Sequence, residues 1–97
     1  MHVEASRGAL LVRFGSRFAV SEAERLQEAI GAFAPFAQLT LDFGEVRQFE
    51  DAAFVPLAKA LGGLGNVELR MRGLTMHQER MLRYFGVGFG GMAVAQA

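Results

Sequence analysis

Two short motifs and two histidines are the features of this sequence whose residue types could carry chemistry. The stretch DFG at 42–44 matches a metal-binding motif of protein kinases, and GVGFGG at 86–91 matches the G-x-G-x-x-G pattern of dinucleotide-binding loops. His2 and His77 are the only imidazoles. Each feature needs a particular context before it can bind a metal ion or a phosphate.

The sequence does not supply that context. A kinase also needs a glycine-rich loop, a strand lysine and a catalytic Asp–Asn pair, for which 97 residues leave no room. A dinucleotide loop follows a strand and opens a helix, whereas a helix is expected before 86–91. No further ligands are spaced to converge on either histidine. We therefore expect no catalytic residue, no cofactor and no metal site, and we do not expect an enzyme.

Arginine is the remaining chemical signal, since nine of the ten basic residues are arginine. A guanidinium group can bind carboxylate or phosphate in a bidentate manner. Arg70 and Arg72 are two residues apart in a predicted strand, so they would point to the same face of a sheet. A small anionic ligand or a nucleotide on that face is one open alternative.

The composition fits one folded domain spanning residues 1–97, with an ordered core over 2–87 and a mobile tail at 88–97. Hydrophobic residues make up 52% of the chain and charged residues 21%, and the formal net charge is zero. A nucleic-acid-binding protein usually has a clear basic excess. We therefore expect a globular domain that binds no nucleic acid.

The sequence also bears on the compartment. It contains no cysteine, which excludes disulfides and thiolate sites. The N-terminal residues do not resemble a signal peptide, and no apolar run reaches the roughly 20 residues of a membrane span. We expect a cytoplasmic protein without membrane insertion.

Alternating apolar and polar residues predict the strands of the domain. The alternation is clear at 9–14, 38–43 and 67–72 and weaker at 2–6. Strands covered on both faces would be continuously apolar, so one face of the sheet should be packed and the other solvated. With helical segments between the strands, this pattern predicts an α/β fold: a four-stranded sheet with helices packed on one face.

Capping signals mark the starts of the first and last predicted helices. Ser21 is followed by Glu24, and Thr75 by Gln78, each at the spacing of a capping box, and an apolar stripe follows each pair. We expect Ser21 and Thr75 to be N-caps. Between these helices, Asp51 is the expected cap of a middle helix, and Pro56 predicts an irregular or delayed first turn there.

The order of these parts resembles the STAS domains, a family named for sulfate transporters and anti-sigma factor antagonists. The resemblance lies in LTLDFGEVRQFEDAAFVPLAKAL and VELRMRGLTMHQERMLRYFGV. Members have an apolar strand ending in Asp, an acidic residue opening a helix, a strand ending near Gly, and a last helix closing on Gly and an aliphatic residue. These features match Asp42, Asp51, Gly73 and the pair at 86–87.

The resemblance has one notable departure. In the phosphorylatable anti-sigma factor antagonists, Asp is followed by two hydroxyl residues, one of which is a Ser that accepts phosphate. In this chain Ala52 and Ala53 occupy those two positions after Asp51. We therefore expect no phospho-switch at this site, and we expect an acidic residue at position 53 to be tolerated.

The resemblance implies a non-enzymatic protein–protein interaction module in bacterial regulation, whose partner is an anti-sigma kinase-like protein. An accessory subunit that contacts the ATPase of a lipid ABC transporter is a second alternative, and a small-ligand or nucleotide sensor is a third. The oligomeric state and the partner's identity stay open. The residues expected to bind the partner are Glu50, Asp51, Ala52, Ala53, Phe54, Val55 and Leu57.

Overall fold

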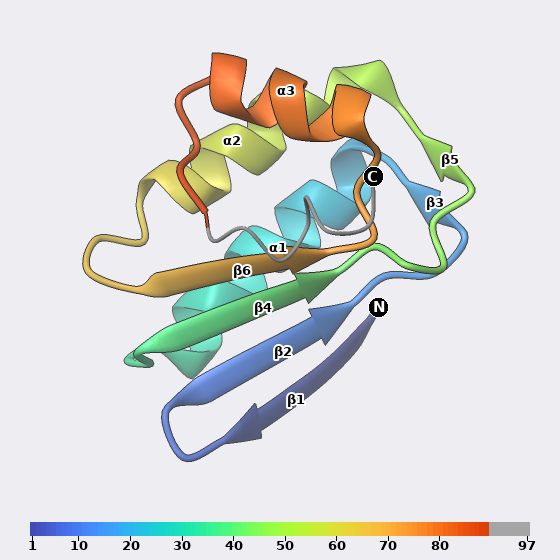
Figure 1. Cartoon of the computed structure of the whole chain (residues 1–97). Helices are drawn as coiled ribbons and strands as arrows, with labels where there is room; N and C mark the ends of the chain where they lie inside the picture. The colour runs from blue at the N-terminus through green and yellow to red at the C-terminus, as the bar shows by residue number, and fades with distance from the viewer. Residues whose placement is uncertain (90–97) are drawn as a thin grey trace.

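The computed structural model describes residues 1–89 as a four-stranded sheet, a two-stranded sheet and three α-helices (Figure 1). All four strands and all three helices expected from the sequence are present. In chain order the elements are β1 (His2–Ser6), β2 (Ala9–Arg13), β3 (Arg17–Phe18), α1 (Val20–Phe33), β4 (Gln38–Asp42), β5 (Gln48–Phe49), the 3-10 turn η1 (Asp51–Ala53), α2 (Phe54–Gly62), β6 (Glu68–Arg72) and α3 (Met76–Tyr84).

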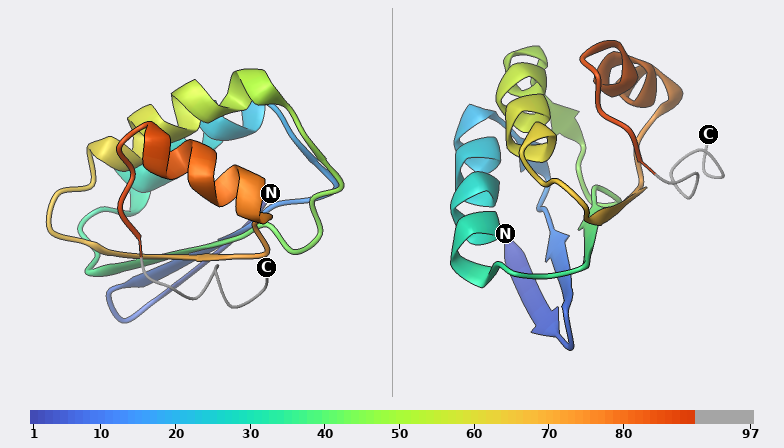
Figure 2. Two further views of the ribbon diagram at one scale, coloured as in Figure 1. Left: turned by 45° about the horizontal axis from the view of Figure 1, so that its top comes forward. Right: turned by 90° about the vertical axis from the view of Figure 1, so that its left-hand side faces the viewer.

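The main sheet has the strand order β1-β2-β4-β6. β2, β4 and β6 are parallel and are joined by the crossover helices α1 and α2, while β1 runs antiparallel at one edge. The helices lie on one side of the sheet (Figure 2). The α/β fold with helices on one face is thus confirmed.

Successive side chains of each strand point to opposite faces of the sheet, and the helices cover only one of these faces. Side chains that face the helices are fully or almost fully buried, and they lie opposite one another in two rows across the parallel strands. The rows are Leu10, Leu39 and Leu69, and Val12, Leu41 and Met71.

A two-residue turn joins β1 to β2. Its central residues, Arg7 and Gly8, have φ angles of 49° and 80°. Two consecutive positive φ angles are the geometry of a type I′ turn, whose twist matches that of the flanking strands. Ser6 and Ala9 therefore close the hairpin as paired residues.

A second, two-stranded sheet was not expected. β3 and β5 pair in parallel through two residues each, Arg17 with Gln48 and Phe18 with Phe49. Strands this short show no period-two pattern, so the sequence gives no sign of them. They place Phe18 and Phe49 with their ring centroids 5.0 Å apart.

The expected cap of α3 is confirmed. The Gln78 N–H donates to the Thr75 side-chain oxygen at 3.1 Å, and the Thr75 N–H donates to the Gln78 side chain at 3.0 Å. These two hydrogen bonds satisfy two of the backbone donors that a helix start leaves unpaired.

The expected cap of α1 is wrong. The helix begins at Val20, so Ala19 is the N-cap and Ser21 lies inside the first turn. Glu22, not Glu24, reaches back to accept the Ala19 N–H at 2.9 Å. Burial acts to raise the pKa of Glu22, but the hydrogen bonds from Ala19 and Ser21 hold that pKa below its ordinary value.

The turn after β6 lies against the turn after β4. Gly73 has a φ of +80°, and a Cβ atom added there would lie 2.5 Å from the backbone nitrogen of Gly44. Gly44 in turn donates its N–H to Asp42 Oδ1 at 2.8 Å. Only glycine allows two backbones to approach this closely at a positive φ.

Residues 90–97 of the predicted tail lie outside the residues that the structure describes. Gly88 and Phe89, which that prediction also included, are described. The Arg83 guanidinium carbon lies 4.3 Å from the centroid of the Phe89 ring.

We predict that Thr75→Ala lowers the free energy of unfolding by about 1 kcal/mol, because it removes the side-chain acceptor of a helix N-cap. Ser21→Ala should stay within about 0.5 kcal/mol of the wild type, because that side chain caps nothing. Denaturant unfolding followed by circular dichroism measures both. Equal losses in the two variants would place the start of α1 at Ser21 after all.

We predict that Gly73→Ala lowers the free energy of unfolding by about 3 kcal/mol or more, because strain at a positive φ adds to a backbone clash. Gly65 is the matched control, since its φ is +69° but an added Cβ would meet nothing within 4 Å. Gly65→Ala should therefore cost only about 1 kcal/mol. If both variants unfold at a similar urea concentration, the close approach of Gly73 to the Gly44 backbone is contradicted.

Candidate docking surface

The chain between β5 and α2 forms a tight turn before it becomes a regular helix. Asp51–Ala53 is a 3-10 turn, and the α-helix begins at Phe54, two residues before Pro56. Proline fits there because the first N–H groups of a helix have no intrahelical partner. The expected irregular first turn is confirmed.

The expected cap at Asp51 is wrong. Glu50 occupies the N-cap position of the 3-10 turn, and no side-chain hydrogen bond caps it. Asp51 is instead the first residue of the turn and is exposed. Its carboxylate lies near the N-terminal end of α2, where the helix dipole favours negative charge.

The seven residues expected to bind a partner divide into an exposed and a buried group. Asp51, Ala52 and Val55 are exposed, with 59% of Val55 accessible, and Glu50 is partly exposed. The other three are buried under them: Ala53, Phe54 and Leu57. We call the four accessible residues, Glu50, Asp51, Ala52 and Val55, the docking surface.

Ala53 is fully buried, so the expectation that an acidic residue would be tolerated there is wrong. A carboxylate at this position would lose its hydration without gaining a partner. Of the two alanines at the hydroxyl positions of the family pattern, only Ala52 faces solvent.

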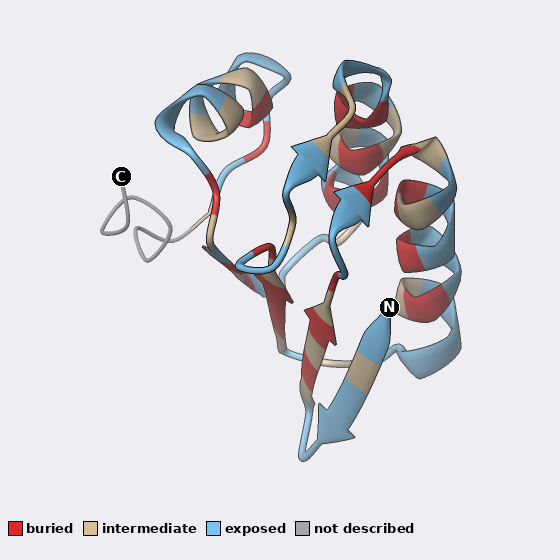
Figure 3. Ribbon diagram, turned by 90° about the vertical axis from the view of Figure 1, so that its right-hand side faces the viewer, coloured by how far each residue is buried: buried red, intermediate tan, exposed pale blue. Residues whose placement is uncertain are grey.

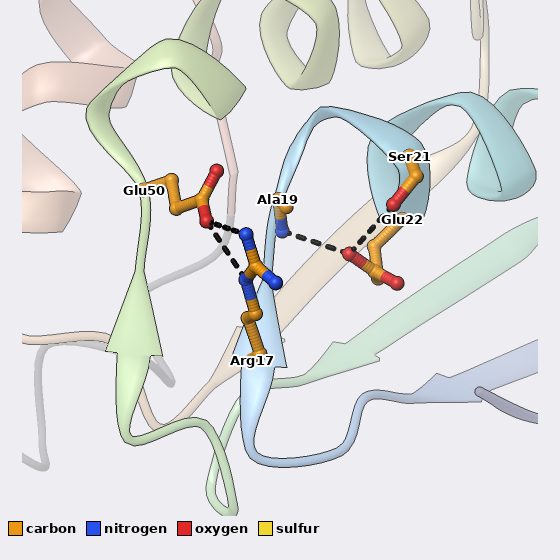
Figure 4. A network of polar contacts seen from close by, with 5 residues as sticks. All are labelled: Arg17, Ala19, Ser21, Glu22 and Glu50. Carbon is orange, nitrogen blue, oxygen red and sulfur yellow. Dashed lines mark hydrogen bonds and ion pairs between the residues drawn. The ribbon is translucent and has the colours of Figure 1, made fainter.

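Arg17 belongs beside the docking surface, although its position in the sequence gives no hint of this. Its Nε donates to Glu50 Oε2 at 2.7 Å, and its Nη2 reaches the same oxygen (Figure 4). The Glu50 N–H also donates to the Phe18 carbonyl at 2.9 Å. These bonds tie the residue before η1 to β3, whose Arg17 lies 33 positions earlier in the chain.

The buried group rests on a run of phenylalanine rings. The Phe54 centroid lies 4.6 Å from that of Phe49, which lies 5.0 Å from that of Phe18. Phe14 and Phe43 continue the run toward the ends of β2 and β4. Phe54 is only 2% exposed and is therefore a core residue, not one that a partner could contact directly.

The start of α3 lies beside the start of α2. The His77 ring meets the Phe54 ring edge-on, with 6.4 Å between the centroids. His77 is exposed, as is its neighbour Met76, with 51% of its surface accessible. An exposed apolar side chain next to this contact widens the apolar surface at this end of the molecule.

Charges of both signs alternate on the open face of the sheet. Arg70 and Arg72 share that face, as expected, but Arg70 Nη2 lies 2.8 Å from Glu68 Oε2. Arg13 lies 3.6 Å from Asp42, and Asp42 lies opposite Arg72 in the sheet register. Arg70 and Arg13 are thus paired with carboxylates on this face, which weakens the case for an anionic ligand there.

The DFG and GVGFGG motifs lie in surroundings that give them no chemical role. The Asp of DFG ends β4 and accepts the Gly44 N–H. The match at 86–91 follows α3 instead of a strand, and its last two glycines lie outside the described residues. Among residues 1–89, no three His, Asp or Glu side chains are grouped closely enough to hold a metal ion.

Within the part of the chain that the structure describes, no helix has the length and apolar character needed to cross a membrane.

Comparison with known proteins relates this chain to others by fold. No family profile and no curated protein matches it. A region of Mglu, known from a crystal structure, has 14% sequence identity and a TM-score of 0.68 over 77% of this chain and 20% of that chain. A region of murine Solute Carrier 26 family member A9, an anion transporter in its inward-facing state, has 15% identity and a TM-score of 0.53 over 86% of this chain and 14% of that chain. The chain therefore spans a minor part of either protein and shares the fold of that part.

Proposed function

We propose that this chain is a STAS-like protein-interaction domain that binds a partner protein through its docking surface. The observation that carries the proposal is the arrangement at the start of α2. Exposed Asp51, Ala52 and Val55 lie directly above the buried side chains of Ala53, Phe54 and Leu57. An apolar centre beside charged neighbours is the usual composition of a protein interface.

Two likenesses support this proposal. The sequence resembles STAS domains over roughly residues 9–87, most strongly after residue 38, and the fold matches part of an anion transporter. The STAS family is named in part for sulfate transporters, and sulfate is an anion, so both likenesses involve anion transporters. In that family, the loop and helix start that correspond to residues 51–54 bind the partner.

We further propose that binding is not switched by phosphorylation at this surface. Ala52, the exposed one of the two alanines, has no hydroxyl group to accept a phosphate. A phosphate would add a charge of about −1.5 to −2 beside Glu50 and Asp51, and like charges there would repel. Without that charge the surface stays competent to bind at all times.

The partner is, in our proposal, a kinase-like anti-sigma protein of a bacterial regulatory system in the cytoplasm. A second candidate is the ATPase of a lipid transporter, for which the likeness to a region of an anion transporter supports the fold alone. The paired charges on the open face give the sensor alternative less support, and a thermal-shift screen with nucleotides tests it. We propose no catalytic role for any of these residues.

We predict that Ala52→Asp weakens partner binding at least about tenfold while leaving the melting temperature nearly unchanged. A third carboxylate beside Glu50 and Asp51 must be desolvated against the partner, and position 52 is exposed, so the fold tolerates it. The partner is captured from the native host, identified by mass spectrometry, purified, and titrated against each variant by calorimetry.

Two variants serve as controls in that titration. Arg72→Glu changes a charge on the open sheet face and should leave the affinity within about twofold of the wild type. Ala53→Asp should unfold the domain or lower its stability by about 3 kcal/mol, because position 53 is fully buried. Loss of binding in Arg72→Glu but not in Ala52→Asp would place the docking surface on the sheet.

We also predict that incubation with ATP and host extract leaves the intact mass unchanged, because the family's acceptor positions are alanines. The remaining candidate acceptors near helix or strand starts are Ser16, Ser21 and Thr75. Stoichiometric addition of a phosphate at one of these would show that another position regulates the domain.

A further inference from the structure

The outer edge of β1 carries backbone hydrogen-bonding groups that no other strand within residues 1–89 uses, since β1 pairs with β2 alone. β1 is exposed along nearly its whole length (Figure 3). It also lacks the proline, lysine and bulge that commonly block pairing at an edge strand. We propose that β1 pairs with β1 of a second copy of this chain, antiparallel about a two-fold axis at Val3.

The turn between β1 and β2 determines which backbone groups face outward. Ser6 and Ala9 flank a two-residue turn, and residues in that position form a hydrogen-bonded pair. Alternation along the strand then directs the groups of Glu4 toward β2 and those of Val3 and Ala5 outward. When the pairing is centred on Val3, the outward backbone N–H and C=O groups of one copy lie opposite those of the second copy.

Side-chain complementarity on the open face selects this register among its neighbours. With the axis at Val3, His2 lies opposite Glu4 of the second copy, and symmetry repeats the pair. Within one chain His2 Nε2 lies 2.8 Å from Glu4 Oε2, so the two copies would bring two such pairs together. An axis at Glu4 would put two carboxylates opposite each other, which is destabilising. A shift by one residue would bring no outward groups together and would turn the helices of the two copies to opposite faces.

Apolar side chains complete the match on the helix side of the sheet. Val3 meets Val3 at the axis, and Met1, which is 45% exposed, lies opposite Ala5 of the second copy. Beside Ala5 is a cavity of about 190 Å³ lined by Leu10, Phe33 and Phe36 among others. Met1 of the second copy would enter this cavity, and the two main sheets would become one continuous sheet.

This pairing is independent of the proposed function, because β1 and the docking surface lie at opposite ends of the molecule (Figure 1). The interface involves one short strand from each copy, so it is small for a stable complex. We therefore expect a weak dimer whose population rises with protein concentration.

Single cysteines test the register directly, because the chain contains no cysteine of its own. In the proposed dimer the two Val3 Cα atoms are about 5.5 Å apart, within the range that a disulfide spans. Val3→Cys should therefore form a covalent dimer under mild oxidation. Ala5→Cys is the matched control and should not, because the two copies of residue 5 are about 14 Å apart along the strands.

A charge swap tests the same pairing without cysteine. His2→Glu and Glu4→Lys should each raise the dimer dissociation constant at least about tenfold in sedimentation equilibrium, because the first places two carboxylates opposite each other and the second removes the acceptor of the His2 ring N–H. The double variant should recover most of the affinity, since its carboxylate at position 2 and its cation at position 4 form an ion pair across the axis.

Three results would overturn the proposal. A wild type that stays monomeric at every concentration tested would leave the edge to some other occupant, such as an extended segment of a partner protein. Cross-linking of Ala5→Cys as fast as Val3→Cys would exclude the register. A double variant as weak as the single variants would show that His2 and Glu4 do not meet across the axis.

Discussion

The packing of Phe54 against Phe49 is the contact on which the docking surface depends. The two rings lie 4.6 Å apart and join α2 to β5, and Phe18 and Phe43 continue the contact to β3 and to the end of β4. Aromatic pairs of this kind contribute about 0.5–1.5 kcal/mol beyond the area they bury. Because Phe54 is held in this way, the turn directly before it has a defined shape, and its exposed residues need little ordering when a partner binds.

The two short strands, β3 and β5, fix that turn in a second way. The Arg17 guanidinium holds the Glu50 carboxylate, and the Phe18 carbonyl accepts the Glu50 N–H. Glu50 is therefore less free to meet a partner than Asp51, whose side chain is exposed. In our proposal the partner faces one ion pair, one exposed carboxylate and an apolar centre at Val55, a surface that a partner with apolar residues and a basic rim would fit.

Local patterns predicted most of the fold, whereas contacts between distant segments were beyond them. Alternation found the four main strands, the spacing of Thr75 and Gln78 found the cap of α3, and Pro56 indicated the irregular turn. The cap of α1 was misplaced because Ser21 and Glu24 have the right spacing, yet Glu22 reaches Ala19 first. The burial of Ala53 follows from the 3-10 turn, whose geometry neighbouring residues do not reveal, and the role of Arg17 depends on a partner far along the chain.

Hydrogen–deuterium exchange of this domain, alone and with its purified partner, tests most directly whether the start of α2 is the docking surface. Exchange reports which backbone amides a partner protects, without altering any residue. Our account predicts slower exchange across residues 50–57 and unchanged exchange across β6 when the partner is bound. Protection of β6 with no change across residues 50–57 would contradict it.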